Sequence, residues 1–569
     1  MASLQAYQSH GRRYYRLVQS FRQNGKPRLR VLVHLGRAED VLRLVEGQRS
    51  PLQVASVSAG AVTALYELAR ELDVAGRIDR ALQQDGQGVQ KRDGLTVGET
   101  LLAGLIGRAC APCSKRAFAG WAAQTYLPEL MGFSAAALTS EHFWEQMGAL
   151  PEKLLGSIEQ ELVRRVVEIE QLRVKALAYD TTNFYTHIAS TNEKPQLPQR
   201  GHNKQRRHDL RQLGLALVVD QTTQLPLAHQ LYAGARSDMK TFAAFLKPLW
   251  ERLRALAGSA EQLTLVFDAG ASSEKNLGSL EPGQDYYVTS VRPSYHRALL
   301  AEGAEHLAEV TLSSGATVRA WRSHRRIAGK EHEVVVVFSP QLYEGQLRGL
   351  QQQAQRVSEE LKEMGFHPRG TPPAIRRRMA KICARQYLRS LVRYQVVRRA
   401  RGKVEVRLWS DLEEYRRLQT HYFGLRILVS NRREWSTAEI VAAYRGQAKA
   451  ESAFRDLKDP GMLATRPQFH WTDQKLQVHA FMCVTGYLLV RLLWWRARRG
   501  TGFAGSPHHL LSELARIRGC RLIEKRGRAG RPRVHWQLEE MDAALRELGQ
   551  HLQAIPYQAK KWYIHPNYT

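Results

Sequence analysis

A chain of 569 residues is too long for a single hydrophobic core, so we expect about three or four structural units. Lys and Arg outnumber Asp and Glu by 84 to 54, which gives a formal net charge of +30. The excess is spread along the chain instead of being confined to one tail. Such a charge distribution favours a large polyanion such as nucleic acid as the partner.

An anionic membrane is the competing partner, and the sequence argues against it. The apolar run from Ala480 to Val490 stops at Arg491, well short of the length of a bilayer crossing. The N-terminal segment lacks the apolar region of a signal peptide. Five cysteines fit a reducing compartment. We therefore expect a cytoplasmic protein.

The first elements in chain order are a pair of strands and a helical region. Residues 12–36 predict a strand, an Asn-Gly turn and a second strand. From about residue 57 to residue 170 the apolar periodicity is helical. The next elements are expected to be strands at 174–185, 213–223 and 226–235, an amphipathic helix at 238–257 and a fourth strand at 263–268.

A mixed block follows, with strand-like segments at 285–291, 316–324 and 332–339. Beyond it lies a basic, largely helical segment that has no acidic residue between Glu363 and Glu405. We expect this segment to contact phosphates without reading sequence, and a solvated helix is the alternative. A further strand at 422–431 leads directly into a helix that contains residues 443–458.

Two of the expected strands end in a carboxylate. Asp180 follows the apolar run 174–179, and Asp268 follows the apolar run 263–267. An ionisable group beside a buried strand costs free energy unless it is paired, hydrogen-bonded or bound to metal. For either residue alone a strand-end turn is the ordinary explanation. Together they suggest a site, because sites in open α/β sheets form at the carboxyl ends of strands.

The order of these elements predicts an α/β protein with a ribonuclease-H-like catalytic core. Three strands that can pair antiparallel are followed by a crossover helix and a strand that can pair parallel. In that arrangement the strand with Asp180 and the strand with Asp268 lie side by side, and the late helix with Glu451 packs near both. The long separation between Asp268 and Glu451 leaves room for a large insertion domain.

The late helix carries an unusual polar stripe. Tyr444, Gln447, Glu451 and Lys458 follow one another at helical spacing and are expected to share one face. Such a stripe is normally apolar in a packed helix. The alternative is a solvated face with an ordinary Glu451–Arg455 pair one turn apart.

The segments around the two aspartates and this helix resemble the DDE transposases of bacterial insertion sequences, within the insertion-sequence-four superfamily. The segments "YDTTNFY" and "VFDAGASSEKNL" resemble those that carry the family's first and second Asp. The family signature Tyr-x2-Arg-x3-Glu-x6-Lys falls on the four residues of the polar stripe. Gln447 replaces the usual Arg, and Arg445 or Lys449 are the neighbours that can compensate for the lost charge.

The resemblance implies catalytic and metal-binding roles for Asp180, Asp268 and Glu451. Carboxylates suit Mg²⁺, with Mn²⁺ as a substitute, and two ions per site serve phosphodiester chemistry. The resemblance also implies contacts with double-stranded DNA, both terminal inverted repeats and target DNA, and a homodimer in a synaptic complex near the nucleoid. The residues expected to contact DNA are Tyr444, Arg445, Gln447, Lys449, Arg455 and Lys458.

Two other functions are weighed against an active transposase. A transposase-derived DNA-binding protein without catalysis would gain nothing from three carboxylates held together. A ribonuclease-H-like nuclease without strand transfer is disfavoured by the long basic additions on both sides of the core. His479, which follows the helix in "LQVHAF", is explained by an ordinary core position, with an active-site contact as the alternative.

The expected division of the chain follows from these elements. The predicted units are an N-terminal strand-rich segment at 1–55, a helical DNA-binding domain at 56–172, a catalytic core at 173–275 and 420–500, an insertion domain at 276–419 and a C-terminal region at 501–569.

Overall fold

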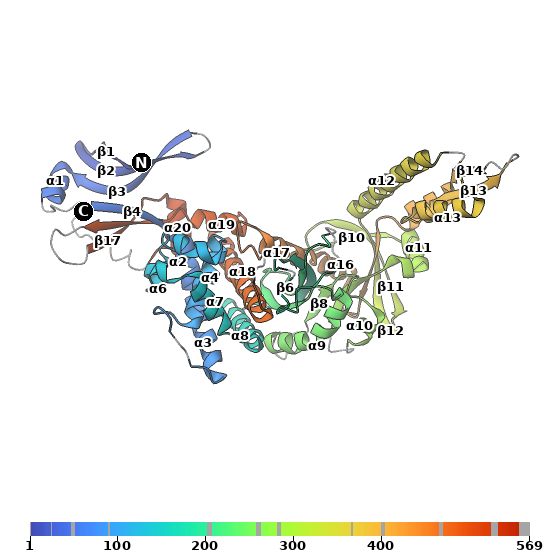
Figure 1. Cartoon of the computed structure of the whole chain (residues 1–569), viewed down its shortest axis with the longest axis horizontal. Helices are drawn as coiled ribbons and strands as arrows, with labels where there is room; N and C mark the ends of the chain where they lie inside the picture. Colours follow the sequence, from blue (N-terminus) through green and yellow to red (C-terminus); the bar gives the residue numbers. More distant parts are fainter. Residues whose placement is uncertain are drawn as a thin grey trace.

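The computed structural model is elongated, with a small sheet at one end and a projecting lobe at the other (Figure 1). It describes residues 2–23, 26–46, 52–88, 91–189, 191–201, 207–257, 263–280, 286–365, 368–399, 404–465, 470–524 and 533–556.

Two three-stranded sheets lie at the N-terminal end. The first consists of β1 (Ala2–Ser9), β2 (Arg12–Gln23) and β3 (Lys26–Arg37), all antiparallel, and α1 (Ala38–Glu46) follows it. The predicted pair of strands at 12–36 corresponds to β2 and β3, and Asn24 and Gly25 of the predicted turn lie outside the described residues.

The second small sheet joins the two ends of the chain. Its order is β17 (Arg533–Leu538), β16 (Arg518–Glu524) and β4 (Leu52–Ser58). Arg30 of β3 forms a 2.8 Å ion pair with Glu539, just after β17. The predicted N-terminal segment and C-terminal region therefore contact each other in space.

A helical region packs around one long helix. The central element is α18 (Asp473–Thr501), which packs against α2, α4, α7 and α8. By length and composition α18 is able to cross a membrane, but its most apolar window is 94% buried inside the protein. The surrounding helices are α2 (Gly60–Glu71), α3 (Val74–Gln84), α4 (Val97–Cys110), α5 (Lys115–Ala122), α6 (Leu127–Met131), α7 (Ser140–Gly148), α8 (Glu152–Glu170), α19 (Pro507–Leu514) and α20 (Ala543–His551).

The centre of the molecule is a nine-stranded mixed sheet of order β10-β11-β12-β15-β9-β8-β5-β6-β7. Strands β5 (Ala176–Tyr185), β6 (Gln212–Asp220) and β7 (Pro226–Ala233) are antiparallel, and α9 (Asp238–Ala257) leads from them to β8 (Thr264–Phe267). Strand β8 pairs parallel with β5. This pairing confirms that the strand that contains Asp180 and the strand that leads into Asp268 lie side by side.

The remaining strands extend the same sheet. Strand β9 (Tyr286–Val291) is parallel to β8, and β15 (Leu425–Ser430), β12 (Lys330–Phe338), β11 (Thr317–Ile327) and β10 (Ala308–Thr311) continue it antiparallel. Residues 286–338, which we expected inside the insertion, thus belong to the main sheet. Short helices α10 (Glu274–Gly278) and α11 (Arg297–Glu305) connect these strands.

Residues 340–421 form a lobe with a hydrophobic core of its own, which projects from the sheet in Figure 1. Leu350, Val357, Ile375 and Met379 are among its buried residues. Its elements are α12 (Pro340–Met364), α13 (Pro372–Ile382), α14 (Leu388–Leu391), β13 (Val392–Arg398), β14 (Val404–Ser410) and α15 (Leu412–His421).

Candidate active site

Asp180 and Asp268 occupy matching places on adjacent parallel strands. The last recorded pair of the β5–β8 ladder is Ala178 with Val266, and each aspartate lies two residues beyond it. Because side chains alternate along a strand, residues two apart share a face of the sheet. Both carboxylates are therefore placed on the same face of the sheet. Asp268 directly follows β8, whereas Asp180 lies in the middle of β5, which continues to Tyr185 and so corrects the expected position of Asp180 at a strand end. Asp180 accepts a hydrogen bond from the Thr181 amide at 2.8 Å.

The late helix is two helices, which corrects the continuous polar stripe expected from the sequence. Helix α16 (Thr437–Arg445) ends before Gly446 and Gln447, and α17 (Ala448–Lys458) begins after them. The Gln221 side chain donates to the Ala443 carbonyl at 2.9 Å, which is the carbonyl that a continuous helix would bond to Gln447. A Cβ at Gly446 would lie 2.1 Å from Gln221 Oε1. The close approach of Gln221 therefore requires Gly446 and interrupts the helix.

Helix α17 is fixed to β5 on either side of Asp180. The Gln447 side chain, only 8% exposed, donates from Nε2 to the Tyr179 carbonyl at 2.7 Å. At the other end of the helix, Lys458 Nζ donates to the Thr182 hydroxyl and lies 5.2 Å from the centroid of the Phe184 ring. Glu451 lies between these anchors and is exposed. The two anchors hold the helix of Glu451 across the strand of Asp180.

Tyr444 is turned into the protein. Its side chain is 8% exposed, and its hydroxyl donates to Ser290 Oγ at 2.9 Å and accepts from Arg426 at 2.8 Å. The Arg426 guanidinium also lies 5.1 Å from the centroid of the tyrosine ring. Sequence reasoning did not identify Arg426, although a charged residue inside the apolar strand 422–431 was a visible signal. Tyr444 thus joins α16 to strands β9 and β15.

A cleft of about 680 Å³ opens between α16, α17, β9, β15 and the beginning of α12. Of the predicted site residues, it is lined by Asp268, Tyr444, Arg445, Gln447 and Glu451.

The other predicted residues stand around this cleft. Asp180 is half-buried on the neighbouring strand, and Lys449 is half-buried on α17. Arg455 is exposed and donates to Ser452 Oγ at 3.1 Å, and the Glu451–Arg455 pair of the solvated-face alternative is not among the ion pairs of the described residues. The structure therefore brings Asp268 and Glu451 to one cleft, with Asp180 beside it.

The carboxylates suit a hard divalent cation. Asp268 and Glu451 are exposed and form no ion pair with any residue that the structure describes. Within the described ranges, no group of three or more His, Cys, Asp or Glu side chains is drawn together as a metal site. Oxygen ligands without His or Cys match the preference of Mg²⁺. The residues present therefore fit that cation.

The protein is thus an α/β protein with one acidic residue inside a strand, a second directly after the adjacent parallel strand, and a third on a helix that is anchored to the first strand. Residues 175–485 match the transposase DDE domain family, and residues 5–56 match the N-terminal domain of IS1634 family transposases. Because the first match spans more than half of the chain, the chain belongs to the DDE transposase family. This confirms the resemblance to the DDE transposases of insertion sequences.

A solved structure of a piggyBac transposase synaptic complex with hairpin DNA is also similar. The two chains share 9% identity, with 81% of this chain and 82% of that chain covered, and the TM-score is 0.37. No curated protein matches the chain.

Proposed function

We propose that this protein is an active DNA transposase. It would bind the terminal inverted repeats of its element, cleave the DNA at the ends and join the 3′-hydroxyl ends to target DNA. The observation that carries the proposal is the matched position of Asp180 and Asp268 on paired parallel strands, beside the helix of Glu451. Membership of the DDE transposase family supports it.

Asp180, Asp268 and Glu451 would hold two Mg²⁺ ions, with Mn²⁺ as a substitute. When bound, the ions stabilise the attacking and leaving oxygens of the phosphodiester. The protein's own part would be to position the three carboxylates: the β5–β8 ladder sets the two aspartates, and the Gln447–Tyr179 bond sets the helix of the glutamate.

Basic residues around the cleft would hold the DNA backbone. Arg445 is exposed on the cleft wall, and Lys449 and Arg455 stand on the same helix as Glu451. Their charges would position phosphates at the carboxylates. Tyr444 and Gln447, which are buried and bonded within the protein, would act as positioning residues for α16 and α17.

The wider DNA contacts belong to the same proposal. The helical region at 56–172 would recognise the element's ends, and the basic lobe at 340–421 would contact phosphates. Cutting two ends in one event would require a homodimer in a synaptic complex. The protein would therefore act in the cytoplasm, in association with the nucleoid, where it meets DNA.

Amide substitutions of the three acids test the proposal. Purified Asp180→Asn, Asp268→Asn and Glu451→Gln proteins should bind DNA that contains the element's ends but should not cleave it in Mg²⁺ or Mn²⁺. Glu413→Gln, an exposed acid on α15, is the matched control and should cleave as the native chain does. Mg²⁺-dependent nicking retained by Asp180→Asn would contradict the assignment. End binding without cleavage by the native chain itself would favour the catalytically silent alternative.

A further inference from the structure

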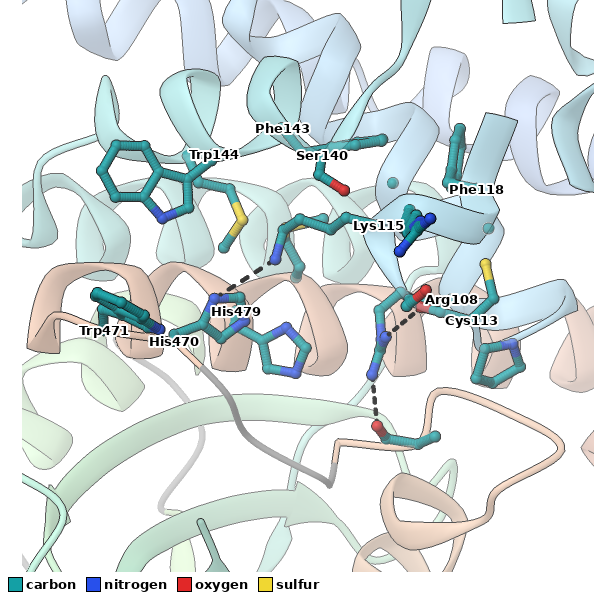
Figure 2. A pocket seen from close by; sticks show the side chains of 18 residues that line it. Arg108, Cys113, Lys115, Phe118, Ser140, Phe143, Trp144, His470, Trp471 and His479 are labelled. Carbon is teal, nitrogen blue, oxygen red and sulfur yellow. Dashed lines mark hydrogen bonds between the residues drawn. The ribbon is translucent and has the colours of Figure 1, made fainter. Parts of the chain in front are cut away.

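A second pocket of about 510 Å³ lies away from the carboxylates, between the helical region and the beginning of α18 (Figure 2). Its walls come from α4, α5, α7, α18 and the segments before α5, after α17 and before α18. The two cavities have no lining residue in common. Nothing in the proposed cleavage chemistry uses this second pocket.

The pocket is cationic. Arg108, Lys115 and Arg116 line it, and none of the described lining residues is an Asp or a Glu. Arg108 has a structural role, because its guanidinium donates hydrogen bonds to the backbone carbonyls of Leu463 at 2.9 Å and Ala464 at 2.5 Å. These bonds hold the segment after α17 against α4 and so complete the wall.

Lys115 points across the pocket toward His470 (Figure 2). Its ammonium donates to His470 Nδ1 at 3.4 Å, and an ammonium has two further N–H donors. Burial, together with the nearby Arg108, lowers the pKa of Lys115 to about 8. Burial also lowers the pKa of His470 well below its ordinary value, so this imidazole is the neutral acceptor at pH 7. An anion bound in the pocket would neutralise the positive charge of its lining, which the described acidic residues of the lining do not do because there are none.

Aromatic rings form the mouth and the inner wall. Trp144 and Trp471 lie on the same side of the pocket in Figure 2 and are 49% and 62% exposed. Phe118 and Phe143 pack edge to face at 4.8 Å deeper inside. Lys475 Nζ lies 3.4 Å from the centroid of the Trp144 ring and so fixes that indole. Two exposed indoles at the edge of a cationic pocket are suited to a planar ligand.

We propose that this pocket binds a nucleotide, with its base against Trp471 and Trp144 and its phosphate at Lys115. Every base offers a π face to an aromatic side chain, and an ammonium that has no carboxylate partner among the described residues suits a phosphate. The volume is within the usual range for a small-molecule site. The ligand is either a free mononucleotide or an unpaired nucleotide of a DNA strand, and both present the same chemistry.

Calorimetric titration of the full-length chain with dAMP tests the site without DNA. The native chain should bind dAMP more tightly than it binds deoxyadenosine or inorganic phosphate. Trp471→Ala should weaken dAMP binding about tenfold. Lys115→Gln should remove the preference for dAMP over deoxyadenosine. The matched controls are Trp409→Ala, a 53% exposed indole on β14, and Lys240→Gln, an exposed lysine on α9, and neither should change the affinity.

The DNA source is tested with duplexes that carry one unpaired 2-aminopurine. Stacking on an indole should quench the fluorescence of this base, and Trp471→Ala should relieve the quenching. A fully paired 2-aminopurine duplex is the control. Fluorescence quenching without calorimetric binding of dAMP would identify an unpaired nucleotide of a DNA strand as the ligand. Calorimetric binding of dAMP without quenching would identify a free nucleotide as the ligand.

Absence of both signals overturns the proposal, as does an unchanged response in Trp471→Ala. Because Trp471 is exposed, that variant should keep the thermal unfolding midpoint of the native chain, and Trp144→Ala provides a second indole variant. Asp180→Asn, which is expected to lack cleavage, should bind dAMP as the native chain does. Failure of this site and failure of the proposed catalysis are therefore separate results.

Discussion

The Gln447 side chain donates a 2.7 Å hydrogen bond to the backbone carbonyl of Tyr179, the residue that immediately precedes Asp180. The bond connects the residue that immediately precedes α17 to β5, the third strand from the edge of the main sheet. Because Glu451 lies one turn further along α17, this single contact relates the position of the helix acid to that of the strand acid.

Gln447→Ala tests the importance of that contact. The change removes the buried hydrogen bond from Gln447 to the Tyr179 carbonyl, which should cost about 0.5–1.5 kcal/mol of unfolding free energy. Cleavage should fall more than tenfold, whereas the affinity for end DNA should change less than twofold. Denaturant unfolding, a cleavage assay and a binding titration measure the three effects. Gln355→Ala, an exposed glutamine on α12, is the control. Loss of DNA affinity without loss of cleavage per bound complex would assign Gln447 to the DNA instead.

A buried charge cluster joins the helical region to the sheet. Glu159 of α8 forms hydrogen bonds and ion pairs with His229 of β7 and Arg252 of α9. Burial alone raises the pKa of Glu159, but its electrostatic interactions and hydrogen bonds with His229 and Arg252 outweigh this effect and hold the pKa below its ordinary value of 4.5. The cluster therefore stabilises the fold above about pH 4.5, and this contribution is lost as the pH falls through the lowered pKa.

Arg252→Met should remove much of that stability. It leaves a buried carboxylate with one partner, and breaking such a pair typically costs about 3–5 kcal/mol. Denaturant unfolding at pH 7 and at pH 3 measures the effect, and the difference from the native chain should shrink at the lower pH. Lys247→Met, an exposed lysine on the same helix, should be neutral at both values. An equal loss of stability at both pH values would indicate packing instead of charge.

The helical region should not fold when it is cut from the rest of the chain. Helix α18 lies at its centre, and α18 belongs to residues 473–501. A fragment of residues 1–172 would expose the apolar surfaces that α2, α4 and α8 bury against α18. We expect this fragment to lack a cooperative thermal transition in circular dichroism, and a cooperative transition would show that the region folds without α18. Recognition of the element's ends is therefore better tested with substitutions in the full chain.

Local sequence patterns located the acids and most strands. Asp180 and Asp268 were visible because each interrupts an apolar run, and the order of elements placed their strands side by side, as β5 and β8 are. The break between α16 and α17 was not visible, since it depends on Gln221, which is far from Gly446 in the sequence. The packing of α18 at the centre of the helical region could not be predicted from the sequence either. A helix that is apolar on all sides gives no periodic signal for the partner it packs against.

Replacement of Glu451 and replacement of Lys458, both on α17, should impair the protein in different ways. Lys458 is tied to Thr182 and lies over Phe184, with Glu451 two turns away on the same helix. If Lys458 also contacts a phosphate, Lys458→Ala should reduce the salt dependence of end binding by about one unit of slope. Thr182→Val removes the same intramolecular bond but leaves the charge, so it should leave the slope unchanged.

Glu451→Ala removes a negative charge that faces a polyanion. Binding of end DNA without metal should therefore persist or tighten, while cleavage is lost and added Mg²⁺ or Mn²⁺ restores little. Titrations of end DNA at several salt concentrations, together with strand-cleavage assays, measure both variants. If α17 presented only a solvated face, both substitutions would change stability by no more than about 0.5 kcal/mol and would retain activity. Equal and small effects would thus contradict the assignment of Glu451 and Lys458 to the active site. Opposite effects on DNA affinity would support a metal ligand and a phosphate contact on the same helix.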